Sequence, residues 1–391
     1  MEITSEAIQA KEPILRMPVS PSLIPSGLSG IDWSFTNRAK AHAIEGIHPY
    51  PAKFIGDIPR AFIEHLAIPI GTRVLDPFCG SGTTLVEAQR SGLATVGIDL
   101  NPIACLLARV KTAPLPSNFI SVVEDVLGKA RAVQAISPSG IPNVDHWFKG
   151  DVQLAVAGLA QTIACDEYKP WLDLLRLALS SILVRVSNQE SDTRYAAIEK
   201  NVGREEVFSY FVAAASKLQK ALENRNWNLS ESQVIEGNTL EIRPEQIGKN
   251  IGLVVTSPPY PNAYEYWLYH KYRMWWLGFD PILVKEQEIG ARAHFFKKNA
   301  HTAEFFVDQM RATFGLIDAV LVKHGFVCFV IGRSKIHGQI INNGDIIEKV
   351  AQERGLCVVT KFDRVINSNR KSFNLSHANI KTETMLVFQK T

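Results

Sequence analysis

The chain has 391 residues, of which 46% are hydrophobic and 21% are charged, and its formal net charge is +3. This composition is that of a globular protein with one elaborated domain or two, and it excludes a low-complexity chain. The small net charge neither demands nor excludes nucleic acid, because a local basic face is sufficient. Five scattered cysteines without a CxxC pair favour a reducing compartment and no structural metal, and neither a signal peptide nor a membrane span is recognisable. We therefore expect a cytoplasmic protein.

The first predicted unit is an N-terminal extension, residues 1–44, which is polar, punctuated by prolines and expected to be a loosely packed arm. From residue 72 onward, continuous apolar strands alternate with helices, a pattern typical of a parallel sheet covered on both faces. Strands are predicted at 72–76, 94–100, 233–236, 251–256, 326–331, 357–360 and 384–388, and helices at 82–91, from 101, and at 345–354. The predicted fold class is α/β, with a doubly wound, mostly parallel, seven-stranded sheet.

Residues 113–230 interrupt this alternation with helical periodicity and no clear strand. We interpret them as a helical insertion and a candidate recognition region, and the flanking segments 45–112 and 231–391 as a single domain. Within the insertion, a polar stretch contains Arg185 and Arg194, whose side chains are long enough to reach phosphates or base edges. A solvated loop between two helices explains the same composition equally well.

A glycine-rich turn follows the first predicted strand, with the sequence Asp76-Pro77-Phe78-Cys79-Gly80-Ser81-Gly82-Thr83. Doubly wound sheets bind ligands at the carboxyl ends of their strands. Gly80 and Gly82 can take positive φ and let a ligand approach the backbone closely. Many strand-to-helix joints use glycine merely to turn, so this motif alone is a weak indication of a site.

An acidic residue strengthens the prediction of a ligand site. Asp99, followed by Leu100, ends the second strand about 20 residues after the turn, where a carboxylate can accept hydrogen bonds from both ribose hydroxyls of an adenosine-bearing ligand. NAD is disfavoured because the turn lacks the GxGxxG spacing. A cofactor with an ammonium group fits better, and we expect S-adenosylmethionine. Asn238, after the third strand, could bond an adenine amino group, although a plain Gly-Asn turn accounts for it as well.

A second motif, Thr256-Ser257-Pro258-Pro259-Tyr260, ends the fourth strand. The exocyclic amino nitrogen of cytosine or adenine is a poor nucleophile because its lone pair is delocalised into the ring. If the Ser257 hydroxyl and the Pro258 carbonyl accept its two N–H bonds, the lone pair is directed at a methyl donor. The two prolines fix the loop, and Tyr260 offers a ring for base stacking, worth roughly 1–3 kcal/mol. A base in a duplex would have to be flipped out to reach this corner. The alternative is a Pro-Pro turn with a packed tyrosine.

These motifs resemble those of the amino-group DNA methyltransferases, which modify cytosine N4 or adenine N6. Residues 76–83 resemble their first motif, Asp99 resembles the ribose-binding acid, and residues 256–260 resemble the catalytic motif, whose serine form is commoner among cytosine-N4 enzymes. Residues 48–54 resemble the motif that packs beside the methionine part of the cofactor. The chain departs from many serine-form members because the cofactor motif precedes the catalytic one.

Two further features complete the resemblance. Asn238 replaces an acid that is often found at the end of the third strand. The aromatic-rich residues 262–278 resemble the helix that follows the catalytic corner, although an aromatic face that packs into the core is an equal explanation. The resemblance covers residues 45–112 and 232–390.

The resemblance implies a Rossmann-like, S-adenosylmethionine-dependent enzyme of a bacterial or archaeal cell that methylates N4 of a flipped cytosine in double-stranded DNA. It implies a place in restriction–modification or phage defence, with a cognate restriction endonuclease or another defence protein as partner. Adenine-N6 methylation of DNA, guanine-N2 methylation of RNA, and a binding protein that has lost its chemistry are the alternatives. The expected catalytic residues are Ser257, Pro258, Pro259 and Tyr260, and the expected cofactor-binding residues are Lys53, Phe54, Asp76, Pro77, Phe78, Cys79, Gly80, Ser81, Gly82, Thr83, Asp99, Leu100 and Asn238.

Candidates for DNA contacts are basic side chains that lie in polar loops, beside aromatic residues or just past a strand end, because such positions suit phosphate contacts. They are Arg185, Arg194, Arg292, Arg333, Lys335 and Arg370. Short basic runs are also common on plain solvated surface.

Overall fold

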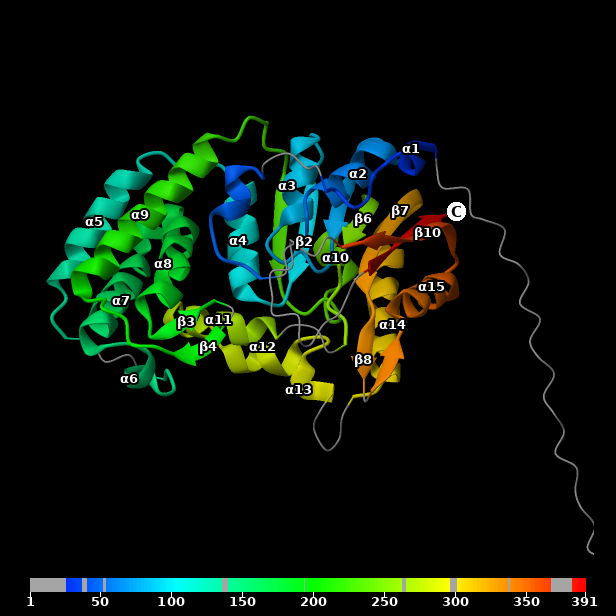
Figure 1. Ribbon diagram of the computed structural model, residues 1–391. Helices are drawn as coiled ribbons and strands as arrows, with labels where there is room; N and C mark the ends of the chain where they lie inside the picture. Colours follow the sequence, from blue (N-terminus) through cyan, green and yellow to red (C-terminus); the bar gives the residue numbers. More distant parts are fainter. Residues whose placement is uncertain are drawn as a thin grey trace, which may run out of the picture.

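The computed structural model describes residues 26–36, 41–51, 54–135, 140–192, 194–261, 265–295, 301–336, 338–366 and 382–391. Its centre is a 7-stranded sheet in the order β10-β11-β7-β6-β1-β2-β5, with helices on both faces (Figure 1). The strands are β1 (Arg73–Asp76), β2 (Thr95–Asp99), β5 (Ser232–Glu236), β6 (Ile251–Thr256), β7 (Leu321–Gly332), β10 (Leu356–Val365) and β11 (Thr382–Lys390). The predicted α/β class and doubly wound sheet are confirmed.

The sheet is parallel from β5 to β7, and only β11 runs in the opposite direction, between β7 and β10. The predicted strands agree with the observed ones to within one or two residues, except that β7 begins at 321 and β10 continues to 365. Both extensions carry polar residues: residues 322–324 of β7 are not fully buried, and β10 is an edge strand with one solvated face. Continuous apolar runs therefore underestimated the length of these two strands.

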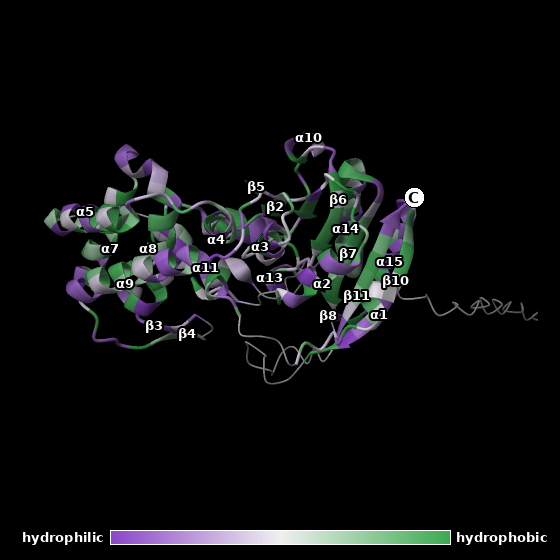
Figure 2. Cartoon of the chain, turned by 90° about the horizontal axis from the view of Figure 1, so that it is seen from above, coloured by the Kyte–Doolittle hydropathy of each residue, from purple (hydrophilic) through white to green (hydrophobic). Residues whose placement is uncertain are grey.

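Successive residues of the central strands point into different cores. Val74 and Leu253 belong to a cluster with Phe62 of α2 (Asp57–His65), whereas Leu75 and Val254 belong to a cluster with residues of α14 (Ala303–Val320) and α15 (Asn343–Glu353). In Figure 2 the strands β6 and β7 are mostly green, and the outer helices are banded in green and purple, as expected for elements that are buried on one side.

The described residues of the segment 113–230 fold into a helical region beside the sheet (Figure 1). Its helices share one apolar core with α4 (Pro102–Thr112) and α11 (Tyr266–Trp276), so the helical region is packed onto both of these helices. The longer helices are α5 (Phe119–Ala132), α7 (Gly150–Ile163), α8 (Leu172–Val186) and α9 (Arg204–Glu223), and the short ones are α6 (Val144–Trp147) and the 3-10 helix η2 (Asp166–Trp171).

The helical region also contains a hairpin that the sequence did not predict. Strands β3 (Gln189–Ser191) and β4 (Arg194–Ala197) pair antiparallel within the polar stretch where a solvated loop was the alternative. Strands of three and four residues without apolar alternation carry too little pattern to be recognised.

The described part of the N-terminal extension is packed, contrary to the expectation of a loose arm. Leu28 of α1 (Ser26–Ser29) is fully buried, and the Trp33 ring lies 5.1 Å from the rings of both Phe62 and Phe362. These contacts cover the face of the sheet that carries α2. Among the described residues, no helix is long and apolar enough to cross a membrane.

Candidate active site

The glycine turn joins β1 to α3 (Thr83–Arg90) and has positive φ at both of its glycines, +48° at Gly80 and +76° at Gly82. A Cβ at Gly82 would lie 2.9 Å from the Cα and Cβ of Ala108, so this glycine allows α4 to pack against the turn. A Cβ at Gly80 would lie 3.5 Å from the Tyr50 hydroxyl. Gly80 therefore faces the cavity described below, whereas Gly82 serves helix packing.

Asp99 holds the turn from the end of β2. Its carboxylate accepts one hydrogen bond from the Gly80 N–H (2.8 Å) and one from the Asn101 N–H (2.8 Å), and each oxygen keeps further acceptor capacity. Burial raises the pKa of Asp99 to about 6, and the two backbone donors offset part of that effect. This carboxylate is thus fixed in orientation and still able to accept ligand hydroxyls.

Asp76 connects the glycine turn to the catalytic corner. It lies at the end of β1, and it accepts hydrogen bonds from the Thr256 hydroxyl (2.6 Å) and from the Phe78 N–H (3.1 Å). Thr256 ends β6, the neighbouring parallel strand, and directly precedes Ser257. Burial raises the pKa of Asp76 to about 6. Two motifs that are 180 residues apart in the sequence are therefore joined by one buried hydrogen bond.

One cavity is lined by both motifs. The predicted residues that line it are Phe54, Asp76, Phe78, Cys79, Gly80, Ser81, Thr83, Asp99, Leu100, Asn238, Ser257, Pro258, Pro259 and Tyr260. Two predicted cofactor residues do not line it: Gly82 packs on α4, and Pro77 accepts a hydrogen bond from the Thr239 hydroxyl through its carbonyl. Lys53 lies outside the described residues.

Asn238 forms a local turn. Its side-chain oxygen accepts a hydrogen bond from the Leu240 N–H (3.1 Å), and its amide nitrogen lies 3.4 Å from the Glu241 carboxylate. The plain turn that the sequence offered as an alternative thus accounts for these contacts, although Asn238 also lines the cavity.

Tyr50, Tyr266 and Glu288 are among the cavity residues that were missing from the predicted site. Tyr50 and Tyr266 come from segments with recognisable motifs, and their rings lie 6.1 Å apart with an angle of 24° between their planes. Glu288 follows α12 (Pro281–Gln287), and the sequence around it gave no indication of a buried carboxylate. At its far end the cavity reaches the ion pair of Arg364 and Glu383, with 2.7 Å between Nε and Oε2.

The aromatic helix α11 serves both of its proposed roles. Tyr272 and Trp276 are buried in the core shared with the helical region, whereas Tyr266, at the start of the helix, lines the cavity. Residues 262–264 of this aromatic-rich segment lie outside the described residues.

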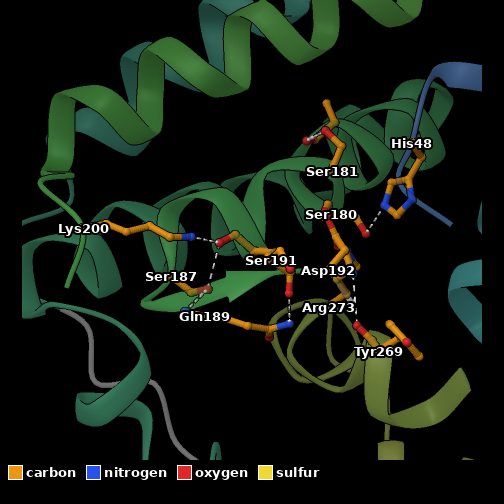
Figure 3. A network of polar contacts seen from close by, with 12 residues as sticks. His48, Ser180, Ser181, Ser187, Gln189, Ser191, Asp192, Lys200, Tyr269 and Arg273 are labelled. Atoms are coloured by element: carbon orange, nitrogen blue, oxygen red, sulfur yellow. Dashed lines mark hydrogen bonds and ion pairs between the residues drawn. The ribbon is translucent and has the colours of Figure 1, made fainter. Parts of the chain in front are cut away.

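A buried polar network fixes α11 to the helical region (Figure 3). Arg273, only 1% exposed, donates hydrogen bonds to the carbonyls of Ser180 (3.0 Å) and Tyr269 (3.1 Å) and forms an ion pair with Asp192 of the hairpin. The Ser180 hydroxyl in turn contacts His48 Nε2 at 2.9 Å. The network therefore links the hairpin to the segment that carries Tyr50 and to the helix that carries Tyr266.

The DNA-contact candidates occupy different environments. The Arg185 guanidinium lies 3.5 Å from the centre of the Tyr210 ring, which ties it to α9. Arg292 begins α13 (Arg292–Phe295), and Lys335 lies on β8 (Ser334–Ile336). Arg333 is 56% exposed, 3.9 Å from Asp363.

The remaining two candidates are less fully described. Arg194 belongs to β4, and Arg370 lies outside the described residues. The hairpin, α12, α13 and β8 all lie along the lower edge in Figure 1, where β7 ends. This is the edge on which a nucleic acid would have to bind to reach the cavity.

The fold and the site together define a methyltransferase-type sheet in which a glycine turn and a Pro-Pro corner line one cavity. Residues 28–109 match a family model described as DNA methylase. The chain is 27% identical to the Type II methyltransferase M.MvaI of Kocuria varians over 256 residues, 59% of this chain and 56% of that protein. It is 37% identical over 107 residues to the Type II methyltransferase M.MjaII of Methanocaldococcus jannaschii, 26% of this chain and 20% of that protein.

Among solved structures, a TehB-like SAM-dependent methyltransferase from Corynebacterium glutamicum aligns with 87% of this chain and 90% of its own, at 11% identity and a TM-score of 0.32. The chain spans at most about half the length of the two curated relatives named above. These matches support the similarity to the amino-group DNA methyltransferases that its motifs predicted.

S-adenosylmethionine is the cofactor of this family, and the cavity fits it. Asp76 is buried and Asp99 is half-buried, and among the described residues neither carboxylate forms an ion pair with a basic side chain. A buried unpaired carboxylate is costly unless a cation compensates it. The cofactor carries two positive centres and a ribose diol, and Gly80 leaves room for it to approach the backbone.

Proposed function

We propose that this chain transfers a methyl group from S-adenosylmethionine to the N4 amino group of a flipped cytosine in double-stranded DNA. One observation carries the proposal: the glycine turn and the Ser257–Tyr260 corner line the same cavity and are joined by the hydrogen bond between Thr256 and Asp76. A methyl donor held at the first motif therefore lies beside a base held at the second.

The corner activates the amino group by position. The Ser257 hydroxyl and the Pro258 carbonyl accept the two N–H bonds, which turns the nitrogen lone pair toward the donor and supports the positive charge that develops on nitrogen. When bound, S-adenosylmethionine supplies a methyl group activated by its sulfonium. Pro258 and Pro259 keep the accepting carbonyl in place, and Tyr260 stacks on the base.

Cytosine is proposed over adenine because the catalytic motif of this chain carries Ser257. The serine form of this motif resembles that of cytosine-N4 enzymes. The matching chemistry at adenine N6 needs the same two acceptors, so adenine is the near alternative. The RNA guanine-N2 alternative has less support, since the relatives reported above are named as Type II methyltransferases. A tRNA (guanine(10)-N2)-dimethyltransferase of Methanothermobacter thermautotrophicus is similar over only 52 residues, 13% of this chain.

Sequencing that detects modified bases in DNA from cells expressing the chain gives both the base and its site. Nucleoside analysis of the digested DNA should show N4-methylcytosine, and cells that express a Ser257→Ala variant should lack it. If N6-methyladenine is found in its place, the target base is adenine and not cytosine. Unmodified DNA together with N2-methylguanosine in RNA would overturn it.

We also propose that the helical region and the β3–β4 hairpin contact the DNA around the flipped base, within a restriction–modification or defence system. The hairpin lies on the same edge as the carboxyl ends of the strands (Figure 1). Its anchoring to α11 through Arg273 would hold it at a fixed distance from the cavity. Footprinting of the target duplex in complex with the enzyme tests this contact directly.

A further inference from the structure

Glu288 lies in the wall of the cavity and has no role in the mechanism above. It is 7% exposed and lines the same cavity as Ser257, Tyr260 and Tyr266. One carboxyl oxygen accepts a hydrogen bond from the Tyr266 N–H at 2.7 Å, and the other lies 3.4 Å from the Trp267 N–H. The second contact is at the limit of a hydrogen bond, so that oxygen is the one left with capacity for a ligand.

The loop that carries Glu288 is held directly against the catalytic corner. Gly290 has φ +73°, and a Cβ at this position would lie 2.5 Å from the Tyr260 carbonyl oxygen. The backbones of residues 260 and 290 are therefore in contact, and no side chain larger than hydrogen fits between them. Glu288, two residues earlier, is thus placed beside the base-binding side of the cavity.

The environment of Glu288 favours a neutral carboxyl. Burial raises the pKa of Glu288 to about 8, and this effect is larger than the opposing effect of the two backbone N–H groups. The nearby carboxylates of Glu265 and Asp99 also raise the pKa of Glu288. Tyr50 and Tyr266 are the other titratable groups facing it, and among the described residues no lysine or arginine forms an ion pair with it. At neutral pH this group therefore offers one O–H donor and one carbonyl acceptor.

We propose that Glu288 recognises the Watson–Crick edge of the target base by donating its carboxyl O–H to the ring nitrogen beside the amino group, which is N3 of cytosine. This inference rests on the proposed function and adds a specificity-determining residue to it. Ser257 and Pro258 take the two amino hydrogens, and the ring nitrogen is the acceptor directly beside that amino group. Adenine presents the same feature at N1, whereas thymine at N3 and guanine at N1 carry an N–H that would face the donor.

Substitution at Glu288 separates a neutral donor from an anionic base. Glu288→Gln keeps the shape, the acceptor for Tyr266 N–H and an N–H donor, and it should retain kcat/KM within about threefold. Glu288→Leu removes the donor and should lower kcat/KM about 10- to 100-fold, the effect of one buried hydrogen bond left unmade. If kcat/KM fell as far in Glu288→Gln as in Glu288→Leu, the proposal would be overturned, because activity would then depend on an ionised carboxylate and not on a neutral donor.

A base analogue provides a readout that a purely structural role would not change. The probe is a duplex with 3-deazacytosine at the methylated position (1-deazaadenine if the site proves to be adenine), which lacks the ring nitrogen but keeps the amino group. The wild-type enzyme should prefer the normal base over the analogue about tenfold more strongly than Glu288→Leu does. The analogue's altered intrinsic reactivity affects both proteins equally and cancels in this comparison. Equal discrimination by the two proteins would overturn the inference.

Glu286→Gln is the matched control. Glu286 lies on α12 two residues before Glu288, is exposed, and is not among the residues that line the cavity. Its variant should keep kcat/KM within about twofold and should keep full discrimination against the analogue. If the wild-type enzyme methylates no normal duplex, the proposed function itself is contradicted. If it methylates the normal duplex and discriminates against the analogue no better than Glu288→Leu does, only the role of Glu288 is contradicted.

Discussion

The two walls of the cavity are built differently. The cofactor wall consists of strand ends and one turn, in which Asp76 and Asp99 accept hydrogen bonds from three backbone N–H groups and from the Thr256 hydroxyl of the neighbouring strand. The other wall, proposed to hold the base and called the base wall, brings together Tyr50, Tyr266 and Glu288 from three separate segments. All three segments are fixed by contacts with the helical region or the catalytic corner. The first wall is set by the sheet, and the second depends on how the surrounding helices and loops pack.

This contrast predicts that the two walls can be damaged separately, and Ser257 should show the largest effect. Ser257→Ala removes one of the two acceptors for the amino group, so methylation should slow about 10²–10³-fold. Cofactor affinity should stay within twofold, because the cofactor wall is untouched. Single-turnover methylation and calorimetric titration with S-adenosylmethionine measure the two quantities. An equal loss in both would mean that the walls are not independent.

Tyr260→Ala tests the base wall through stacking. The loss of the ring should weaken base engagement about 10- to 100-fold, as expected for roughly 1–3 kcal/mol of stacking. Binding of a duplex with an abasic target position should be unchanged, and so should cofactor affinity. Weaker cofactor binding in this variant would show that Tyr260 belongs to the other wall.

Asp99→Ala should have the converse effect. Removing the carboxylate should weaken S-adenosylmethionine binding about 10- to 100-fold, since hydrogen bonds to charged groups are worth roughly 1.5–3 kcal/mol. Affinity for the DNA duplex without cofactor should not change. Normal cofactor affinity in this variant would disprove the ribose contact assigned to Asp99.

The cofactor wall should also be sensitive to pH. Burial raises the pKa of Asp76 and Asp99 from 3.8 to about 6. Folded pKa values above the unfolded ones mean that their contribution to stability is fully present below pH 3.8 and is lost as pH rises through 6. A cationic cofactor binds the ionised carboxylates, so its affinity should fall about tenfold between pH 7.5 and pH 5, with proton release on binding near pH 6. Titrations in buffers of different ionisation enthalpy measure both, and a flat profile would contradict the assignment.

The smallest expected effect concerns the link between the helical region and α11. Asp192→Ala removes one partner of the buried Arg273, and the free energy of unfolding should fall by about 1–3 kcal/mol. Glu199→Ala is the control, because Glu199 is 86% exposed in its pair with Lys149 and should change stability by less than about 0.5 kcal/mol. Denaturant unfolding compares the two variants, and equal stability would show that the hairpin is not held by this pair.

The same contrast explains which features the sequence could predict. The strands β1, β2 and β6, the glycine turn and Asp99 follow from local patterns, because apolar runs, glycines and a strand-end acid act within a few residues of one another. The shared cavity also follows, since parallel strands end at one edge of the sheet. Glu288 could not be predicted, because its burial comes from α11 and the catalytic corner and not from its neighbours in sequence.

The common core of α4, α11 and the helical region has a consequence for experiments on truncated chains. Deleting residues 113–230 would uncover apolar faces on both helices, one leading from the ribose-binding strand and the other bearing Tyr266. Loss of activity in such a deletion variant would then result from misfolding of the remaining chain, and it would give no information on DNA recognition. Surface substitutions on β3 and β4, which leave that interior intact, are the informative way to map the bases that this enzyme selects.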